Sequence, residues 1–382
     1  MKTTPLLKEA VETFNNQERL TKEHGSELFE NGSLNLLGFL ANKARLRHNP
    51  SNLGTFVVDT ILNYTNICNV LCKFCAFYEL PKSKKGYDLT IEQILERVQE
   101  LVDYGGTQVL MQGGVNPRYR IQDFKNIFEK IKEKFPTVEI HSLSSAEIEW
   151  IAKKEKMSFN KVFSELKKSG YMSLPGAGAE ILVDRVRKKI SPLRSSRDVW
   201  LNIHRSAHEE GLTSSCTMTY GFEETTMEKM EHFDVLRKLQ DETTGFTAFV
   251  CWGFQPGGTE LTHLKAPGGE AYLRHVALGR LMLDNIPHLQ AGWVTDGPKL
   301  CQMAMNYGAD DFGGVVIGEE VIAATGVHHK VGPNEAVRLI KDLGRIPAQR
   351  NTYYDILRTF PEDVEYPMPE RKNESDFSIP LI

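Results

Sequence analysis

The pattern of apolar and polar positions changes near residue 50. Before it, apolar residues recur at helical spacing, and Asn31-Gly32 interrupts the pattern. After it, short apolar runs rich in β-branched residues alternate with segments of helical period. The sequence therefore predicts an N-terminal helical segment over residues 1–48, an alternating β/α domain over 49–360, and an extended tail rich in proline and charge over 361–382.

Eight of the apolar runs are expected to form strands, at 56–62, 107–111, 138–142, 171–174, 214–220, 245–252, 288–294 and 310–317. Helices are expected between them, at 90–104, 120–134, 145–155, 159–169, 178–189, 196–210, 226–241, 270–285, 297–307 and 333–343. Near-continuous apolar strands separated by helices are typical of a parallel sheet covered by helices. Eight such units in about 300 residues favour a closed (β/α)₈ barrel, and a doubly wound open sheet is the alternative.

Composition and charge favour a small-molecule substrate. The 382 residues carry 46 Lys and Arg against 50 Asp and Glu, a net charge of −4. This balance provides no electrostatic attraction for nucleic acid or anionic lipid. The N-terminus lacks the apolar run of a secretory signal, and no uncharged apolar stretch has the length of a membrane span. We therefore expect a cytoplasmic protein without a nucleic-acid or membrane partner.

Three of the six cysteines, Cys68, Cys72 and Cys75, lie within eight residues directly after the first predicted strand. In a parallel barrel this is the carboxyl end, where active sites form. Thiolates suit iron–sulfur clusters, and three of them leave one iron of a four-iron cluster without a protein ligand. Structural zinc normally has four ligands, and no second Cys or His pair with suitable spacing occurs. The spacing favours a [4Fe-4S] cluster over zinc or three buried thiols.

The C-x₃-C-x-aromatic-C loop, with Phe74 before the last cysteine, resembles the signature of the radical S-adenosylmethionine (SAM) superfamily. The pair Gly113-Gly114, after the second predicted strand, resembles the glycine motif with which the superfamily approaches SAM. Longer segments are similar to the futalosine-pathway branch of menaquinone biosynthesis, and they read NYTNIC (63–68), CAFY (75–78), LPGAGAEIL (174–182), GFTAF (245–249) and PAQRNT (347–352). The resemblance covers residues 30–358.

This resemblance implies a [4Fe-4S] cluster and SAM as cofactors, with the three cysteines as cluster ligands. It also implies that a 5′-deoxyadenosyl radical removes the C4′ hydrogen of dehypoxanthine futalosine, after which the sugar radical adds to the benzoate ring. An electron donor such as flavodoxin or ferredoxin would reduce the cluster. Aminofutalosine synthase is the alternative within the branch, and a non-catalytic metal-binding protein is the alternative from another class.

Candidate site residues lie near the predicted strand ends. Those expected to contact SAM are Tyr64, Asn66, Phe74, Gln112, Gly113, Gly114 and Glu180. His141 ends the third strand and is the first candidate for a base or for a hydrogen bond to substrate. Glu147 is a second polar candidate, and Arg350 is a candidate for binding the benzoate carboxylate, since a guanidinium can bind two oxygens. Each has an ordinary structural role as its alternative.

Residues of the fifth and sixth strands raise two further expectations. Thr219 and Tyr220 end the fifth strand and Gln255 follows the sixth, so they are expected to line the pocket. Cys216 and Cys251 fall inside these strands. A second cluster within the barrel, as in biotin synthase, is therefore an alternative to two buried thiols, which are the ordinary outcome for strand cysteines.

Overall fold

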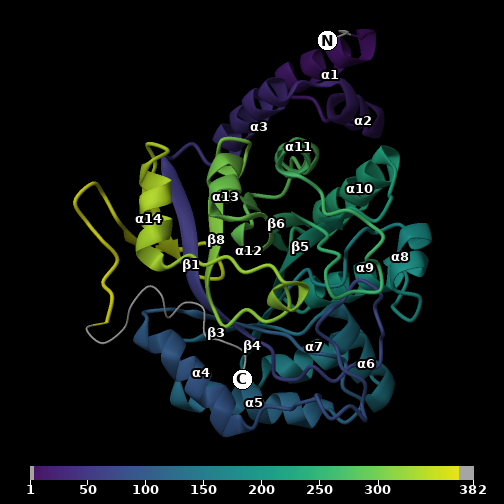
Figure 1. The fold of residues 1–382 in the computed structure, drawn as a ribbon, viewed down its shortest axis with the longest axis vertical. Helices are drawn as coiled ribbons and strands as arrows, with labels where there is room; N and C mark the ends of the chain where they lie inside the picture. The colour runs from purple at the N-terminus through teal and green to yellow at the C-terminus, as the bar shows by residue number, and fades with distance from the viewer. Residues whose placement is uncertain (1–3, 370–382) are drawn as a thin grey trace.

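A computed structural model describes residues 4–369, in which a sheet of eight parallel strands closes on itself at the centre of the molecule (Figure 1). The strands are β1 Leu53–Leu62, β2 Gln108–Met111, β3 Glu139–Ser142, β4 Tyr171–Leu174, β5 Thr213–Tyr220, β6 Phe246–Gly253, β7 His288–Gln290 and β8 Asp311–Ile317. Neighbours pair in chain order, and β8 pairs back with β1. This confirms the predicted barrel and excludes the open sheet.

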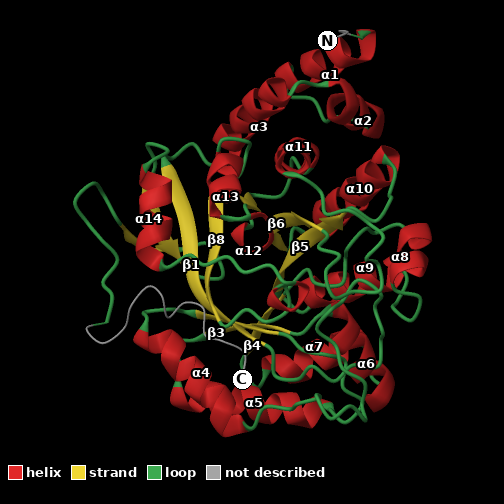
Figure 2. Ribbon diagram, viewed as in Figure 1, coloured by secondary structure: helices red, strands yellow, loops and turns green. Residues whose placement is uncertain are grey.

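Helices cover the outside of the barrel, and Figure 2 shows them in red around the yellow strands. They are α4 Ile91–Asp103, α5 Ile121–Lys134, α6 Ser145–Glu155, α7 Phe159–Lys167, α8 Asp184–Ile190, α9 Arg197–Glu209, α10 Thr226–Thr243, α11 Gly269–Met282, α13 Pro298–Met305 and α14 Pro333–Lys341. Their starts follow from local sequence: Thr90 accepts a hydrogen bond from Gln93 N, and the Gln93 side chain accepts one from Thr90 N. The short helix α12 Trp293–Asp296 and a 3₁₀ turn at Ala323–Thr325 contribute side chains to the interior instead.

Strand β5 shows why the barrel encloses a cavity rather than a filled core. Successive side chains of a strand point to opposite faces. Ser215, Thr217 and Thr219 line the interior, whereas Cys216 and Met218 are buried and do not line it. Barrel interiors are usually filled by bulky branched side chains, so short polar ones leave space.

Two strands beyond the barrel were not predicted. Strand β9 (Ile346–Arg350) runs parallel to the first half of β1, and β10 (Ile356–Thr359) runs antiparallel to β9. Pro347 and Gln349 interrupt the apolar pattern that marks the other strands. The pairing places β9 beside the end of the barrel opposite the cysteine loop.

Two predicted elements differ from the structure. The strand expected over 288–294 is wrong after Gln290, where β7 ends and α12 soon begins. The helix expected over 178–189 begins only at Asp184. Gly178 and Glu180 have φ angles of +92° and +38°, which an α-helix does not contain.

The N-terminal helices are α1 Pro5–Asn15, α2 Lys22–Asn31 and α3 Leu34–His48. Helices α2 and α3 pack against α10 and α11 on the outside of the barrel, and α1 packs against α2 (Figure 1). In the first part of the predicted tail, Tyr366 is buried and donates a hydrogen bond to Tyr104 O (2.6 Å). The rest of that tail, 370–382, lies outside the described residues. No helix in residues 4–369 is long and apolar enough to cross a membrane.

Candidate functional site

The three cysteines of the motif lie in the loop that follows β1. Cys68 and Cys72 are buried, Cys75 is partly exposed, and none forms a disulfide. The Val70 and Val115 amides donate to Cys68 Sγ (3.4 and 3.3 Å), and Ser191 Oγ donates to Cys72 Sγ (2.9 Å). Hydrogen bonds to sulfur are a feature of iron–sulfur sites, because they tune the thiolate ligands.

The donor set, three thiols in one loop, is of the kind that binds iron–sulfur clusters. Within the described residues, no group of three or more His, Cys, Asp or Glu side chains could hold one metal ion together. A four-iron cluster instead places each thiolate on a different iron. Burial raises the pKa of the Cys72 thiol to about 11 and also raises that of Cys75. Such thiols ionise when a metal binds, since the metal takes the thiolate.

The glycine pair packs against the cysteine loop. A Cβ on Gly114 would lie 2.2 Å from Ile67 O and 3.0 Å from Cys68 Cβ, and one on Gly113 would lie 2.8 Å from the Tyr64 ring. Gly114 N also donates to Thr65 O (2.9 Å). The missing side chains therefore make room for the backbone that carries the cysteines. Contact of either glycine with SAM stays a prediction.

Tyr64, Glu147 and Asn66 support this loop and do not line the cavity described below. Tyr64 Oη donates to Glu147 Oε1 and Ser144 N donates to Glu147 Oε2, both at 2.6 Å. Burial raises the pKa of Glu147. The Asn66 side chain donates to the Lys85 carbonyl and accepts from the Tyr87 amide. The geometry thus gives Glu147 and Asn66 structural partners, and their predicted contacts with cofactor or substrate stay predictions.

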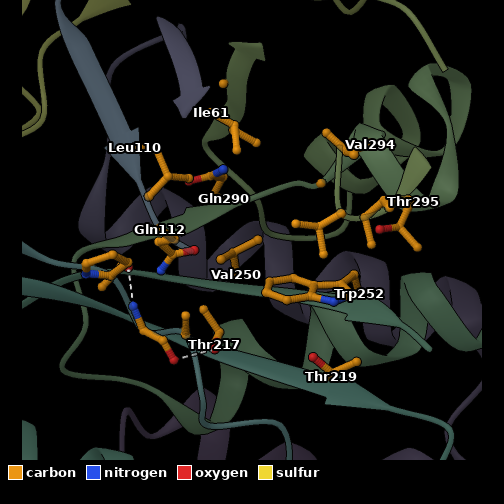
Figure 3. Close-up of a pocket in the computed structure, with 18 of the residues that line it drawn as sticks. Ile61, Leu110, Gln112, Thr217, Thr219, Val250, Trp252, Gln290, Val294 and Thr295 are labelled. Carbon is orange, nitrogen blue, oxygen red and sulfur yellow. Dashed lines mark hydrogen bonds between the residues drawn. The ribbon is translucent and has the colours of Figure 1, made fainter. Parts of the chain in front are cut away.

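A cavity of about 400 Å³ lies inside the barrel. Phe74 and Cys75 of the cysteine loop line one end, and Arg350 and Tyr354 line the other. Figure 3 shows Gln112, Thr217, Trp252 and Gln290 around this space. The Gln112 side-chain nitrogen is buried without a hydrogen-bond partner in the described structure, so it is available to a ligand.

Glu180 lines the cavity near the cysteine loop and pairs with an arginine that the sequence analysis missed. Arg194 Nη1 donates to Glu180 Oε2 (2.6 Å), and its guanidinium lies 5.5 Å from the centre of the Phe74 ring. Burial lowers the pKa of Arg194, but the nearby Cys72 and Glu180 outweigh it and raise the pKa overall. Arg194 lies in an irregular loop after α8, where no sequence pattern marks it.

His141 lines the cavity, as its place at the end of β3 predicted. Its Nδ1 and Ser173 Oγ are 2.6 Å apart. Burial, with a contribution from Arg350, lowers the pKa of His141 to about 3. The ring is therefore neutral at physiological pH and suits a hydrogen bond to substrate better than proton abstraction.

Arg350 lines the end of the cavity opposite the cysteine loop, but its guanidinium already binds a carboxylate. Its Nε and Nη2 donate to the two oxygens of Asp311, and Nη1 donates to Asn351 O (2.9 Å). The guanidinium also lies 3.9 Å from the centre of the Tyr354 ring. The role of Arg350 in binding a benzoate carboxylate stays a prediction. That role depends on the positive charge of the guanidinium, which the Asp311 carboxylate neutralises.

The residues singled out on β5 and β6 divide between the two faces of the barrel wall. Thr219 and Gln255 line the cavity, as expected. Tyr220 does not, because it points outward and stacks on His275 with ring centres 3.5 Å apart, so that prediction is wrong. Cys216 and Cys251 are buried on the outward face as well. The alternative of a second cluster inside the barrel is therefore wrong.

Two protein-family models match this chain, and both belong to radical SAM enzymes. A model of the radical SAM superfamily matches residues 62–236, and a model of the CofH/MqnC C-terminal region matches residues 243–364. The barrel and its cysteine loop are thus those of a radical SAM enzyme, a class whose cofactors are a [4Fe-4S] cluster and SAM.

The similar curated proteins define the family more narrowly. The cyclic dehypoxanthine futalosine synthase of Halalkalibacterium halodurans is 43% identical over 92% of this chain and 94% of its own length. The enzyme of the same name from Streptomyces coelicolor is 39% identical over 92% and 89%. An aminodeoxyfutalosine synthase from Thermus thermophilus is 35% identical over 90% and 94%. The chain belongs to the family of futalosine-pathway radical SAM enzymes that includes these proteins.

Solved structures share the fold at low sequence identity. HydG from Carboxydothermus hydrogenoformans, a maturase of FeFe-hydrogenase, superposes with a TM-score of 0.73 over 91% of this chain and 80% of that one, at 16% identity. Methylornithine synthase (PylB) gives 0.72 over 89% and 97%, at 18% identity. Both support the barrel architecture alone.

Proposed function

We propose that this enzyme cyclises dehypoxanthine futalosine. The proposal rests on the 43% identity to a cyclic dehypoxanthine futalosine synthase over nearly the whole of both chains. When bound, the cluster and SAM supply a 5′-deoxyadenosyl radical. In the reaction, the ribose C4′ hydrogen passes to the 5′-deoxyadenosyl radical, and the sugar carbon bonds to the benzoate ring. The ring then recovers aromaticity by releasing a proton to a base or solvent and an electron to a one-electron acceptor such as an oxidised flavodoxin or ferredoxin. The product has two hydrogens fewer than the substrate.

In this proposal, Cys68, Cys72 and Cys75 hold the cluster, and Phe74, Gln112 and Glu180 are the SAM-contacting candidates that line the cavity. The cavity begins at the cysteine loop, so a substrate inside it lies next to the bound cofactors. Its walls shield a reactive radical from water and fix the reacting carbon. The neutral His141 hydrogen-bonds the substrate. A flavodoxin or ferredoxin supplies the reducing electron in the cytoplasm.

The test is an anaerobic assay of the cluster-reconstituted protein with SAM, a reductant and dehypoxanthine futalosine. A product lighter by two hydrogens supports the proposal, and its absence contradicts it. A parallel assay with a carboxyvinyloxybenzoate tests the alternative, since an aminodeoxyfutalosine synthase is 35% identical to the chain. Turnover of that compound alone would reassign the enzyme.

A further inference from the structure

The cavity wall away from the cysteine loop carries a carboxylate oxygen without a partner. Asp59 lines the cavity and is only 4% exposed. Its Oδ1 is buried and has no hydrogen-bond partner in the described structure. A buried carboxylate oxygen without a partner is unfavourable. A ligand that donates a hydrogen bond there would remove this cost.

The position of the Asp59 carboxylate is fixed by its neighbours. Gln108 Nε2 donates to Asp59 Oδ2 (3.2 Å), and Thr352 Oγ1 donates in turn to Gln108 Oε1 (2.8 Å). On the other side, a Cβ on Gly314 would lie only 2.4 Å from Asp59 Oδ1. The glycine therefore makes room for the carboxylate, which is held in one orientation beside the cavity.

The charges near Asp59 decide which group suits it. Arg350 is the nearby cation, and it already binds both oxygens of Asp311. The lowered pKa of His141 keeps that ring neutral. The cation that acts on Asp59 is thus already paired, and a hydroxyl can donate to the unpaired Asp59 oxygen. Burial raises the pKa of Asp59 to about 7, and a hydroxyl donor on Oδ1 would favour its ionised form.

We propose that Asp59 forms a subsite for a hydroxyl group of the substrate sugar. The identity of that sugar rests on the proposed function. Asp59 Oδ1 accepts a hydrogen bond from a ribose hydroxyl. The aromatic carboxylate then lies away from Asp59, because two negative groups would repel each other there.

The test measures binding to the cluster-reconstituted protein by anaerobic calorimetry without reductant. The ligands are dehypoxanthine futalosine, an analogue without the 2′ and 3′ hydroxyls, and an analogue with a carboxamide in place of the carboxylate. Removing the hydroxyls should weaken binding to the wild type at least about tenfold. In Asp59→Asn this difference should shrink several-fold, while the effect of the carboxamide stays as in the wild type.

Asp296→Asn is the matched control, since Asp296 Oδ2 is also buried without a partner but the residue does not line the cavity. It should discriminate between the ligands as the wild type does. If Asp59→Asn folds poorly, Gly314→Ala tests the same carboxylate by displacing it. Undiminished discrimination against the deoxygenated analogue in these variants, or a changed carboxamide effect, would overturn the subsite.

Failure of the proposed function gives a different result. In that case the wild type does not convert dehypoxanthine futalosine. Saturation-transfer NMR with D-ribose as the probe then compares the wild type with Asp59→Asn. A ribose signal that depends on Asp59 supports the subsite, and equal signals refute it.

Discussion

At the scale of single residues, the glycine pair determines how closely two backbone segments approach at the cysteine loop. The Cβ of alanine at position 114 would meet a carbonyl oxygen and a cysteine Cβ, neither of which can rotate away. The loop would have to move, and with it Cys68.

We therefore expect Gly114→Ala to lower the iron content of the reconstituted protein by more than half and to destabilise the fold by about 1–3 kcal/mol. Iron analysis and chemical denaturation measure the two effects. Gly268→Ala is the control, since nothing lies within 4 Å of its added Cβ. It should keep full iron and lose less than about 1 kcal/mol. Equal iron in both variants would contradict this account.

His232 is a buried group whose neutral form the fold requires. Leu182 N donates to its Nδ1 (3.0 Å), and burial lowers its pKa to about 3. In the unfolded chain the pKa is about 6.5, so below that pH the unfolded state binds a proton that the folded state does not. This group's contribution to stability is complete above pH 6.5 and falls as the pH drops toward 3.

We expect wild type to lose about 2 kcal/mol more stability than His232→Gln between pH 6.5 and pH 5. Urea denaturation at the two pH values measures this difference. His328→Gln, which removes an exposed histidine, should follow the wild type. Parallel pH profiles for wild type and His232→Gln would show that position 232 does not titrate as described.

Site residues that form a local sequence pattern could be predicted from the sequence. Site residues that come together only in the folded structure could not. Cys68, Cys72 and Cys75 are visible because their spacing is itself the signal. Arg194 could not be found, because it meets its partner Glu180 only in the folded structure. The two residues lie in separate irregular loops whose conformations the sequence does not specify. Asp59 left a signal that was overlooked, namely a charged residue inside an apolar strand.

At the scale of elements, β9 closes the end of the barrel opposite the cysteine loop. Arg350 and Asp311 tie β9 to β8, and they are only 3% and 0% exposed. Removing one partner of a buried pair leaves the other charge uncompensated, which is more damaging than removing both.

Arg350→Ala should therefore destabilise the fold by about 3–5 kcal/mol, and adding Asp311→Asn should recover part of the loss. Denaturation of the two single variants and the double variant measures the coupling. If Arg350 mainly binds a substrate carboxylate, the single variant would instead keep its stability and lose substrate affinity. That outcome would restore the role first expected for this residue.

Element prediction succeeded where hydrophobic periodicity is determined by packing. The barrel strands were found because their outward residues are apolar, as Cys216 and Met218 of β5 illustrate. Strand β9 was missed because its pattern is broken by Pro347 and by polar residues that meet buried partners in the barrel. The segment before α8 was predicted as helix, because positive φ angles at non-glycine residues such as Glu180 depend on tertiary contacts.

At the scale of the whole molecule, the cysteine loop brings together segments that are distant in the chain. Cys72 receives a hydrogen bond from Ser191, and Lys73 O accepts one from Glu260 N. Cofactor binding at this loop should therefore stabilise the protein as a whole. SAM at a hundredfold excess over its dissociation constant should add about 2.7 kcal/mol.

Anaerobic scanning calorimetry of the reconstituted protein with and without SAM measures this effect as a rise in the melting temperature. Cys75→Ala is the comparison, since SAM would lack an intact cluster to bind. An equal rise in the variant would mean that SAM binds independently of the cysteine loop.

The closed end of the barrel limits how molecules reach the reaction chamber. Asp59, Gln108, Arg350 and Thr352 line this end and are each less than 9% exposed, so these side chains narrow it. A substrate would then reach the cavity from the end beside the cysteine loop. If SAM binds at that loop, as proposed, the substrate has to bind before SAM, and the product can leave only after 5′-deoxyadenosine.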